Sequence, residues 1–509
     1  MKRRFTFRRY LLLIPVACTL AGAHRAWAQD DIPLGERLRK NPLPASATHL
    51  ESGGKVYRDS CAGCHGMDGK PNPQTEQSTP TPQGDLSDFR MESIRDGEIY
   101  WVVTHGIENF MPASQSKLSD TQRWEVVLYI RELRARRKAI EVAKLGPYPW
   151  KLPVGFPYPN VPADNPMTLE KVELGRYLFY DQRLSLNQTQ SCASCHKQKL
   201  AFTDGRPRGV GSTGELHPRG AMSLANVAYS PALTWANPNI HQLEQQALLP
   251  MFGENPIELG MSGKEALLIE RLKAEPKYQK LFAAAFPKES NPFIVANVVK
   301  AIASFERTII SGDSPYDRYA RGGDPNAITE SAKRGELLFF GEKLECFHCH
   351  GGFNFTGTVD YFQKGLPEVE FHNTGLYNLK GRTSYPVPNT GIYEFTQNPD
   401  DVGKFKAPTL RNVMLTTPYM HDGSVKTIDD VIDHYGAGGR TIKSGPLAGV
   451  GAENPNRSDF VQGFELTAEE RKDLHAFLES LTDKSFLTDP ALSNPWISVS
   501  HPSGQGVEK

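Results

Sequence analysis

Hydrophobic residues recur at helical spacing along much of the chain, and no long stretch alternates hydrophobic and polar positions as a half-buried strand does. One predicted helix follows Ser119, which can cap its first turn, and Trp124 and Leu128 mark its apolar face. Further helices are predicted over 264–286 (broken near Pro276), 293–310 and 465–481. The pattern therefore predicts a mainly α-helical protein.

The first residues have the pattern of an export signal. A basic start, residues 2–9, precedes the mostly apolar stretch 11–23, and Ala26-Trp27-Ala28 supplies a cleavage motif. We expect residues 1–28 to be a signal peptide, so that the mature protein works in the periplasm. An uncleaved membrane anchor is the alternative, but the apolar stretch is short for a span. No later segment is apolar enough to be one.

The charges of the chain balance. Its 509 residues include 58 Lys+Arg and 58 Asp+Glu, so no overall field attracts nucleic acid or an anionic membrane surface. We therefore expect no nucleic-acid partner. A chain of this length exceeds one ordinary domain, and about three domains are expected.

Six of the seven cysteines lie in three Cys-x-x-Cys-His motifs, and the seventh, Cys18, lies in the signal peptide. Disulfides, zinc sites and thiol redox pairs also use cysteines, but none of them explains a His after the second Cys three times. This motif is the attachment signal of c-type haem, whose iron the His binds. The sequence therefore predicts three covalently bound haem c groups, on Cys61, Cys64 and His65, on Cys192, Cys195 and His196, and on Cys346, Cys349 and His350.

The haem motifs and a proline-rich stretch divide the chain into segments. Prolines are dense between the first two motifs, where we expect an extended linker. No fixed sequence period relates the three motifs. The predicted segments are the signal peptide (1–28), a flexible leader (29–50), a first haem domain (51–144), the linker (145–166), a second haem domain (167–329), a third haem domain (330–483) and a C-terminal surface arm (484–509).

The first haem domain has the features of an electron carrier. Met111 lies before a proline, in a loop that leads into a helix, and its thioether is expected to bind the second face of the iron. Such a ligand raises the reduction potential and leaves no open site. His105 is the competing ligand, and core packing of Met111 is the alternative. Residues 51–144 resemble a small class I cytochrome c domain.

Several longer phrases surround the second and third haem motifs. They include Leu-Phe-Tyr-Asp at 178–181, Ala-Phe-Thr-Asp-Gly at 201–205, Lys-Ala-Pro-Thr-Leu-Arg-Asn-Val at 406–413 and Thr-Pro-Tyr-Met-His-Asp-Gly at 417–423. In this order they resemble the bacterial dihaem cytochrome c peroxidase and MauG superfamily over residues 167–483. Residues 233–238 and 250–254 look closest to MauG-like members found in methanobactin operons. The resemblance implies a peroxidatic haem domain (167–329) and an electron-transfer haem domain (330–483).

The resemblance makes the His196 haem the peroxide site. Gln246 and Glu258 match residues that family members place on the distal side of this iron, although the interval between them is slightly longer than the family pattern. Glu258 is expected to move a proton between the peroxide oxygens, and Gln246 to orient the peroxide. Family peroxidases can block the iron with a His on a mobile loop. Here Ser212 has the aligned position and His217 is out of register, so an open site is expected, as in MauG.

The resemblance gives the His350 haem the task of electron transfer. Family peroxidases usually provide its iron with a Met at the position that Tyr435 occupies here, and MauG-like enzymes carry Tyr there. A phenolate is a hard, anionic ligand that stabilises oxidised iron. His434 is the alternative ligand.

Two further features are implied between these haems. Trp235 aligns, shifted by one residue, with a Trp that assists electron or hole transfer, and core packing is the alternative. Family members also bind Ca²⁺, partly through backbone carbonyls that match Thr416 and Pro418. The Asn expected to add a side-chain ligand is replaced by Gly220, so calcium binding stays an open expectation.

Three functions are compatible with these residues, and a peroxide-using enzyme is favoured. In the first, electrons from a small donor protein or the quinol pool enter at the first haem and reduce hydrogen peroxide at the second, by way of the third. A tethered donor supports this function because it raises the effective concentration. In the second, peroxide drives oxidation of a Trp or Tyr on a partner protein through a high-valent pair of haems. The third is a non-catalytic multihaem electron carrier, against which the open site argues.

Overall fold

The computed structural model describes residues 32–71, 84–92, 94–107, 111–146, 148–364, 366–379 and 384–497. The predicted signal peptide, 1–28, lies outside these ranges. The chain divides into two compact units, unit 1 (Met1–Tyr57 and Arg95–Tyr129) and unit 2 (Arg58–Ile94 and Ile130–Lys509). Within the described ranges, no helix is both long enough and apolar enough to cross a bilayer.

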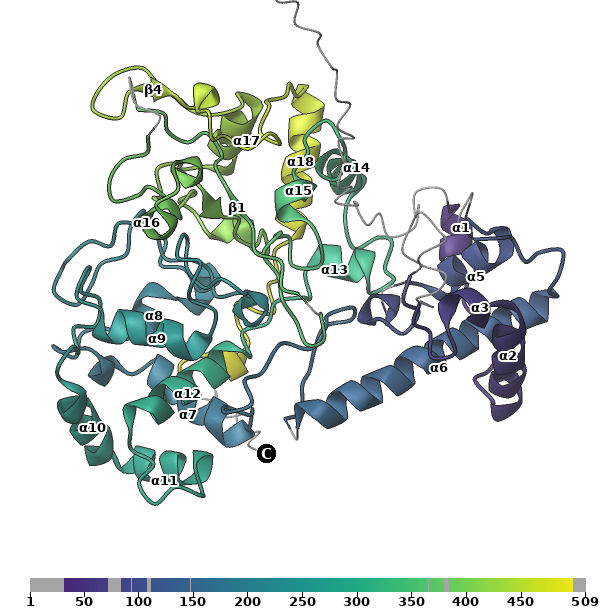
Figure 1. The fold of residues 1–509 in the computed structure, drawn as a ribbon, viewed down its shortest axis with the longest axis horizontal. Helices are drawn as coiled ribbons and strands as arrows, with labels where there is room; N and C mark the ends of the chain where they lie inside the picture. Colours follow the sequence, from purple (N-terminus) through teal and green to yellow (C-terminus); the bar gives the residue numbers. More distant parts are fainter. Residues whose placement is uncertain are drawn as a thin grey trace, which may run out of the picture. The chain divides into compact units, whose positions relative to one another are not determined.

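Helices dominate the described residues, as predicted, and strands form two short antiparallel pairs. The pairs are β1 (Phe371–His372) with β2 (Phe405–Lys406), and β3 (Thr441–Ile442) with β4 (Gly449–Val450). The longer helices are α2 (Ala47–Ser60), α5 (Asp96–His105), α6 (Asp120–Leu145), α7 (Leu169–Phe179), α9 (Leu243–Phe252), α10 (Glu265–Ala274), α11 (Pro276–Ala285), α12 (Val295–Glu306), α14 (Glu330–Phe339), α17 (Ile428–Gly436) and α18 (Ala468–Ser480) (Figure 1). The short helices are α1 (Leu34–Arg37), α3 (Ala62–His65), α8 (Cys192–Cys195), α13 (Pro315–Ala320), α15 (Phe347–His350) and α16 (Tyr393–Thr396).

The helices predicted from the hydrophobic pattern are confirmed. The break expected near Pro276 separates α10 from α11, because proline begins the second helix where its missing N–H costs nothing. The Ser119 hydroxyl accepts the Gln122 N–H (3.2 Å) and caps α6. Three of the short helices, α3, α8 and α15, contain parts of the haem motifs.

Unit 1 packs aromatic side chains and close backbones together. The Tyr100 ring of α5 stacks on Trp124 of α6, with centroids 4.0 Å apart. The predicted flexible leader, 29–50, contains α1 and the first residues of α2. Ile32 is buried and α1 packs against α5, so this part of the leader belongs to the packed structure rather than to a free tail.

The same close helix–helix packing at a glycine occurs twice in unit 2. Helix α7 packs against α12, and α14 packs against α18; Figure 1 shows each pair side by side. A Cβ added to Gly175 would lie 1.9 Å from the Ala301 carbonyl oxygen, and one added to Gly335 would lie 1.9 Å from the Asp473 carbonyl oxygen. Only glycine permits such close backbone contact. Each pair therefore places the helix before a haem motif against the last long helix of the same segment.

The C-terminal arm, 484–509, was predicted to lie on the surface, but its described part packs against the second haem segment. Phe486 and Leu492 are buried in the same core as α7 and α12. Trp496 donates its indole N–H to the Tyr177 carbonyl (3.0 Å). The proline and serine content of this segment predicted a surface arm and did not reveal that Phe486, Leu492 and Trp496 attach it to the core.

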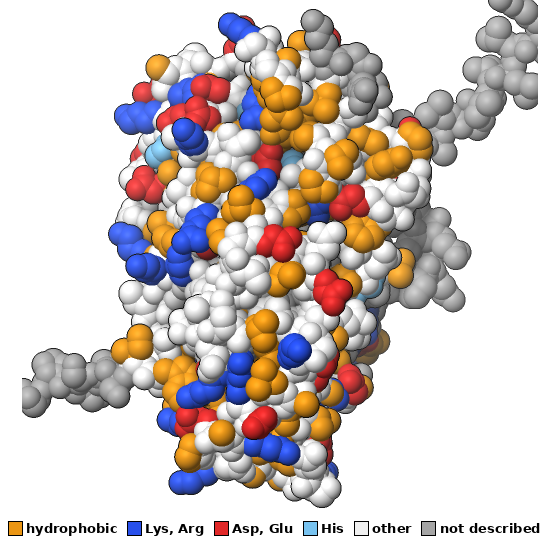
Figure 2. All heavy atoms as spheres, turned by 90° about the vertical axis from the view of Figure 1, so that its left-hand side faces the viewer, with side chains coloured by type: hydrophobic (Ala, Val, Ile, Leu, Met, Phe, Trp, Pro, Cys, Tyr) orange, Lys and Arg blue, Asp and Glu red, His pale blue; other side chains and the backbone are white. Residues whose placement is uncertain are grey.

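Charged side chains of both signs are interspersed on the face of the molecule that Figure 2 shows. No single-sign field covers that face, which agrees with the equal numbers of acidic and basic residues.

Replacing Gly175 or Gly335 by Ala is expected to destabilise the protein by about 1–3 kcal/mol, because the new methyl group would overlap a backbone carbonyl. Urea unfolding of the haem-loaded protein measures the change. Gly35→Ala is the matched control, since a Cβ there has no atom within 4 Å. Equal stability of all three variants would contradict the packing argument.

Candidate functional site

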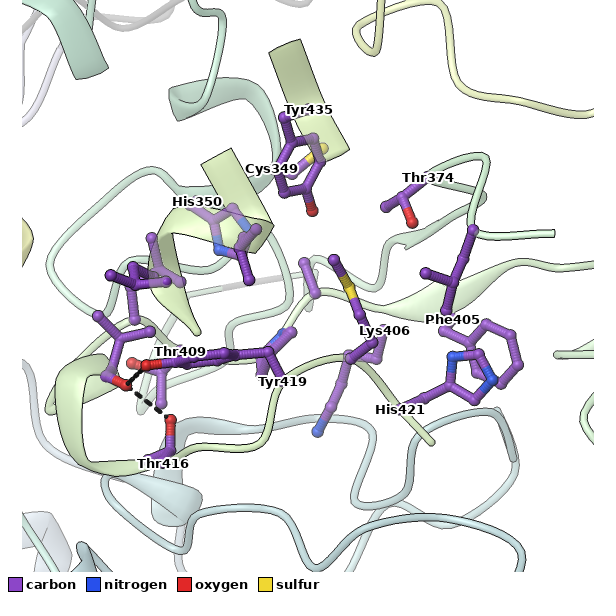
Figure 3. A pocket seen from close by; sticks show the side chains of 18 of the residues that line it. Cys349, His350, Thr374, Phe405, Lys406, Thr409, Thr416, Tyr419, His421 and Tyr435 are labelled. Carbon is purple, nitrogen blue, oxygen red and sulfur yellow. Dashed lines mark hydrogen bonds between the residues drawn. The ribbon is translucent and has the colours of Figure 1, made fainter. Parts of the chain in front are cut away.

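A cavity in unit 2 is built around the third haem motif. Cys346, Cys349 and His350 line it, and Tyr435 enters it from α17 (Figure 3). Apolar side chains from α14, α17 and α18 form much of the remaining wall, among them Phe339, Ile428, Val431, Ile432, Leu474 and Leu478. Two thiols, one imidazole and an apolar wall are the groups that a covalently bound haem needs, so these residues fit the cofactor.

The His350 imidazole is prepared to bind a metal. Its Nδ1 lies 3.2 Å from the Phe355 carbonyl oxygen, which can accept a hydrogen bond only from a protonated Nδ1. Nε2 is then left with its lone pair, as iron ligation requires. Burial lowers the pKa of His350 to about 4, so the ring stays neutral at physiological pH.

Tyr435 and His434 differ in their access to this cavity. The Tyr435 side chain lines it, whereas His434 is not among the lining residues. Burial, followed by the nearby Cys349 and Cys346 sulfurs, raises the pKa of Tyr435 well above its usual value. The phenol is therefore neutral without a metal, and ligation would require a cation to displace its proton. The structure brings Tyr435, rather than His434, together with His350.

The second haem motif repeats the arrangement of the third. The His196 Nδ1 lies 2.9 Å from the Phe202 carbonyl oxygen, and burial lowers the pKa of His196. Both motifs thus orient the imidazole through a backbone carbonyl that follows the motif by a few residues.

Glu258 returns to the helix that carries Gln246. After α9 the chain folds back, so that the Leu259 N–H donates to the Pro250 carbonyl (2.8 Å) and the Met261 N–H to the Met251 carbonyl (2.9 Å). Glu258, next to Leu259 in the chain, therefore lies beside the C-terminal half of α9, and Gln246 lies one helical turn before Pro250 on the same helix. The longer interval between Gln246 and Glu258 is taken up by this return loop.

The Glu258 carboxyl has an altered acidity and lies near the haem-attachment thiols. Burial raises the pKa of Glu258 to about 7. The carboxyl is close enough to Cys192 and Cys195 to affect the pKa of both thiols. A group that is half-protonated near neutral pH is suited to proton transfer. Gln246 is half-buried on α9.

The loop that contains Ser212 packs directly on Glu258. The Ser212 N–H donates to the Glu258 carbonyl (2.6 Å), and a Cβ on Gly211 would lie 1.9 Å from the Ile257 carbonyl oxygen. The Ser212 hydroxyl is buried without a hydrogen-bond partner in the described structure. His217 lies beyond this contact, with its Nδ1 3.1 Å from the Arg219 carbonyl oxygen. The position closest to Glu258 carries a hydroxyl and no imidazole.

Trp235 is half-buried and lines the cavity that also contains His350. Its indole N–H donates to the Gly220 carbonyl (2.9 Å), and its own carbonyl accepts the Lys406 N–H (2.9 Å). These contacts fix the ring between segments of the second and third haem motifs. Lys406 begins the sequence phrase at 406–413, and the sequence predicted no role for its side chain. A lysine is rarely buried unless a partner compensates its charge.

The two calcium donors predicted from the sequence, Thr416 and Pro418, lie at the same cavity. The Gly220 carbonyl is bonded to the Trp235 indole. Among the described residues there is no group of three or more His, Cys, Asp or Glu side chains that could hold a metal ion. Ca²⁺ is bound mainly by carboxylate and carbonyl oxygens in larger number. Calcium binding through the Thr416 and Pro418 carbonyls therefore stays a prediction.

The first haem motif lies in α3, within unit 2, whereas Met111 lies in unit 1. The pairing of Met111 with His65 therefore remains a prediction. Burial lowers the pKa of His65, as it does for the other two motif histidines. The competing residue, His105, is exposed at the end of α5, with its Nδ1 3.0 Å from the Trp101 carbonyl oxygen.

Comparison with known proteins identifies relatives along most of the chain. A family described as di-haem cytochrome c peroxidase matches residues 169–325, and one described as cytochrome C oxidase, cbb3-type, subunit III matches residues 48–130. Methylamine utilization protein MauG of Methylorubrum extorquens is 36% identical over 346 residues, which cover 67% of this chain and 86% of that protein. Cytochrome c peroxidase Ccp of Escherichia coli is 32% identical over 353 residues, covering 68% of this chain and 70% of that protein.

A solved structure gives the same result. The crystal structure of a MauG-like protein associated with microbial copper homeostasis is 49% identical, with a TM-score of 0.68, and the match covers 69% of this chain and 100% of that one. The relatives are named as cytochrome c peroxidases and MauG proteins, which are oxidoreductases of the haem peroxidase type. The chain therefore belongs to the di-haem cytochrome c peroxidase and MauG family, and it is a haem peroxidase-type oxidoreductase that binds haem covalently.

Proposed function

We propose that this protein is a periplasmic enzyme with three haem c groups that uses hydrogen peroxide at the His196 haem. The observation that carries the proposal is the return loop that brings Glu258, with a pKa of about 7, back to α9, the helix that carries Gln246. Periplasmic location rests on the signal pattern of residues 1–28. The three attachment motifs support the haem count.

The residues around the peroxide site have separable tasks. Haem, when bound, supplies the iron at which peroxide is reduced. Glu258 in its carboxylate form accepts a proton from one peroxide oxygen and returns it to the other, which leaves as water. Gln246 offers amide groups that orient the peroxide, and the loop at Ser212 holds the Glu258 backbone in place. Reduction of a peroxide to two waters takes up two electrons and two protons.

Electrons are proposed to arrive from a small donor protein or the quinol pool. They enter at the haem of the first domain, whose iron His65 and Met111 would bind. They pass to the His350 segment and then by way of Trp235 to the peroxide site. The covalent linkage of the first domain supports this route, because a tethered donor acts at high effective concentration.

A second function, oxidation of a Trp or Tyr side chain on a partner protein, is favoured by one observation. Tyr435 lies where family peroxidases carry Met, and it lines the cavity together with His350. A phenolate ligand stabilises oxidised iron, which disfavours uptake of electrons from a donor and favours a pair of haems that retains the two oxidising equivalents of peroxide. The likeness to a MauG-like protein associated with microbial copper homeostasis supports this candidate as well. A third function, a non-catalytic electron carrier, would leave the raised pKa of Glu258 without a purpose.

Glu258→Gln is expected to lower kcat/KM for hydrogen peroxide by about 10²–10⁴-fold, because an amide cannot accept the peroxide proton. In the unaltered protein kcat/KM should rise with pH through about 7, since burial raises the pKa of Glu258 to about 7 and only the carboxylate is a base. Steady-state kinetics between pH 5 and 9 (about two units on each side) measure both effects.

The control for this variant is Glu254→Gln, which removes an exposed carboxyl from the same return loop. It should keep the rate and the rise near pH 7. If the Glu258→Gln enzyme still shows the increase of kcat/KM near pH 7, Glu258 is not the proton acceptor.

Tyr435→Phe is expected to change the optical and Mössbauer signals of the His350 iron, because it removes the hydroxyl that would bind it. His434→Gln, which alters the alternative ligand, should leave them unchanged. The fully oxidised protein is also mixed with one equivalent of peroxide and no donor. A long-lived change at two irons that Tyr435→Phe abolishes favours partner-protein oxidation. No reaction before partial reduction favours the peroxidase and contradicts the open site at Ser212.

A further inference from the structure

Lys406 is a buried lysine at the junction of the second and third haem segments. It ends β2, and its backbone N–H donates to the Trp235 carbonyl (2.9 Å). Its side chain lines the cavity that contains His350 and Tyr435, and the residue is only 7% exposed. Figure 3 shows its amine directed away from His350 and Tyr435, toward the second haem segment.

Among the described residues, the Lys406 amine is bonded only to neutral oxygens. Nζ donates to the Ser230 hydroxyl (3.0 Å) and to the Ala232 carbonyl (2.5 Å). An ammonium has three N–H donors, so one donor has no partner among the described residues. Burial lowers the pKa of Lys406 to about 7, and no charged neighbour offsets this effect.

The charged groups on neighbouring elements are already engaged with one another. Arg219, whose guanidinium lies over the Phe405 ring, pairs with Glu394. His372, which faces Phe405 across the β1–β2 pair, lies 3.3 Å from the Glu370 carboxylate. The Asp204 carboxylate, which also lines the cavity, accepts the Arg206 backbone N–H (2.9 Å). None of these carboxylates forms an ion pair with Lys406 in the described structure.

A buried cation without a counter-ion is costly, and proteins normally pair such groups. Haem brings two propionate carboxylates, and the cavity that Lys406 lines has the thiols and imidazole that fit this cofactor. We propose that Lys406 is a haem-binding residue whose ammonium pairs with a propionate carboxylate of one of the two catalytic haems. The inference rests on the proposed haem loading at His196 and His350. Either haem offers the same chemistry.

The pairing has an electrostatic consequence. With a carboxylate beside it, the ammonium keeps its proton above neutral pH. Its positive charge partly neutralises the propionate, so less negative charge remains to stabilise oxidised iron. Lys406 thereby places a positive charge beside Trp235, whose carbonyl accepts the Lys406 backbone N–H.

The test compares haem-loaded Lys406→Met, Lys406→Arg and the unaltered protein by redox titration of each haem and by resonance Raman spectra of the propionate bending modes. Lys406→Met should lower the reduction potential of one catalytic haem and shift the propionate band of the same haem. That haem is then the source of the carboxylate. Lys406→Arg should stay close to the unaltered protein, since it keeps the charge. Lys404→Met, two residues earlier and paired with Asp401, is the control and should change neither signal.

Unchanged potentials and Raman bands in a folded Lys406→Met protein with full haem content would overturn the proposal. The pH dependence of the potentials decides the matter if Lys406→Met does not fold. An unpaired amine would produce a step near pH 7 in the unaltered protein that Lys406→Arg removes, because a guanidinium does not titrate there. Such a step would also overturn the proposal, and its absence supports it. Neither readout uses peroxide, so failure of this inference is distinct from failure of the proposed function.

Discussion

The contact on which the catalytic half of the molecule depends is the close approach of two helix backbones at a glycine, made once at Gly175 and again at Gly335. Each contact holds the helix before a haem motif against the last long helix of its segment. Downstream, Asn226 and Asn412 adopt the same left-handed backbone conformation and bond to the chain just after those last helices. The second and third haem segments are thus two versions of one structural unit.

The sequence predicted helices and haem motifs well because both depend on local signals. It did not reveal the arrangement that the two segments share, since the shared features are single glycines, asparagines and carbonyls at unequal spacings. The return loop that brings Glu258 to α9 was also beyond its reach, because it depends on long-range backbone bonds made by Leu259 and Met261. The packed C-terminal arm was missed for a similar reason: three apolar residues among prolines form no periodic pattern.

The surroundings of His196 and His350 differ in how burial acts on nearby ionisable groups. Near His196, burial brings the pKa of the Glu258 carboxyl to about 7, where a small change of surroundings decides its protonation. Near His350, burial moves the pKa of the Tyr435 phenol far from neutrality, so that only a strong positive charge can ionise it. One physical effect therefore yields a carboxyl that exchanges protons readily in one segment and a phenol that holds its proton firmly in the other.

The hydrogen bond between the Ser212 N–H and the Glu258 carbonyl links the loop that contains Ser212 to the residue proposed as the acid–base group. In an enzyme with a gated active site, the loop at the entrance moves while the catalytic residues keep their positions. Here a backbone hydrogen bond joins Ser212 to Glu258, and the close contact between Gly211 and the Ile257 carbonyl holds the same two chain segments together. Any displacement of this loop would pull on Glu258, so a change that closed the site at Ser212 would also move the residue proposed for proton transfer.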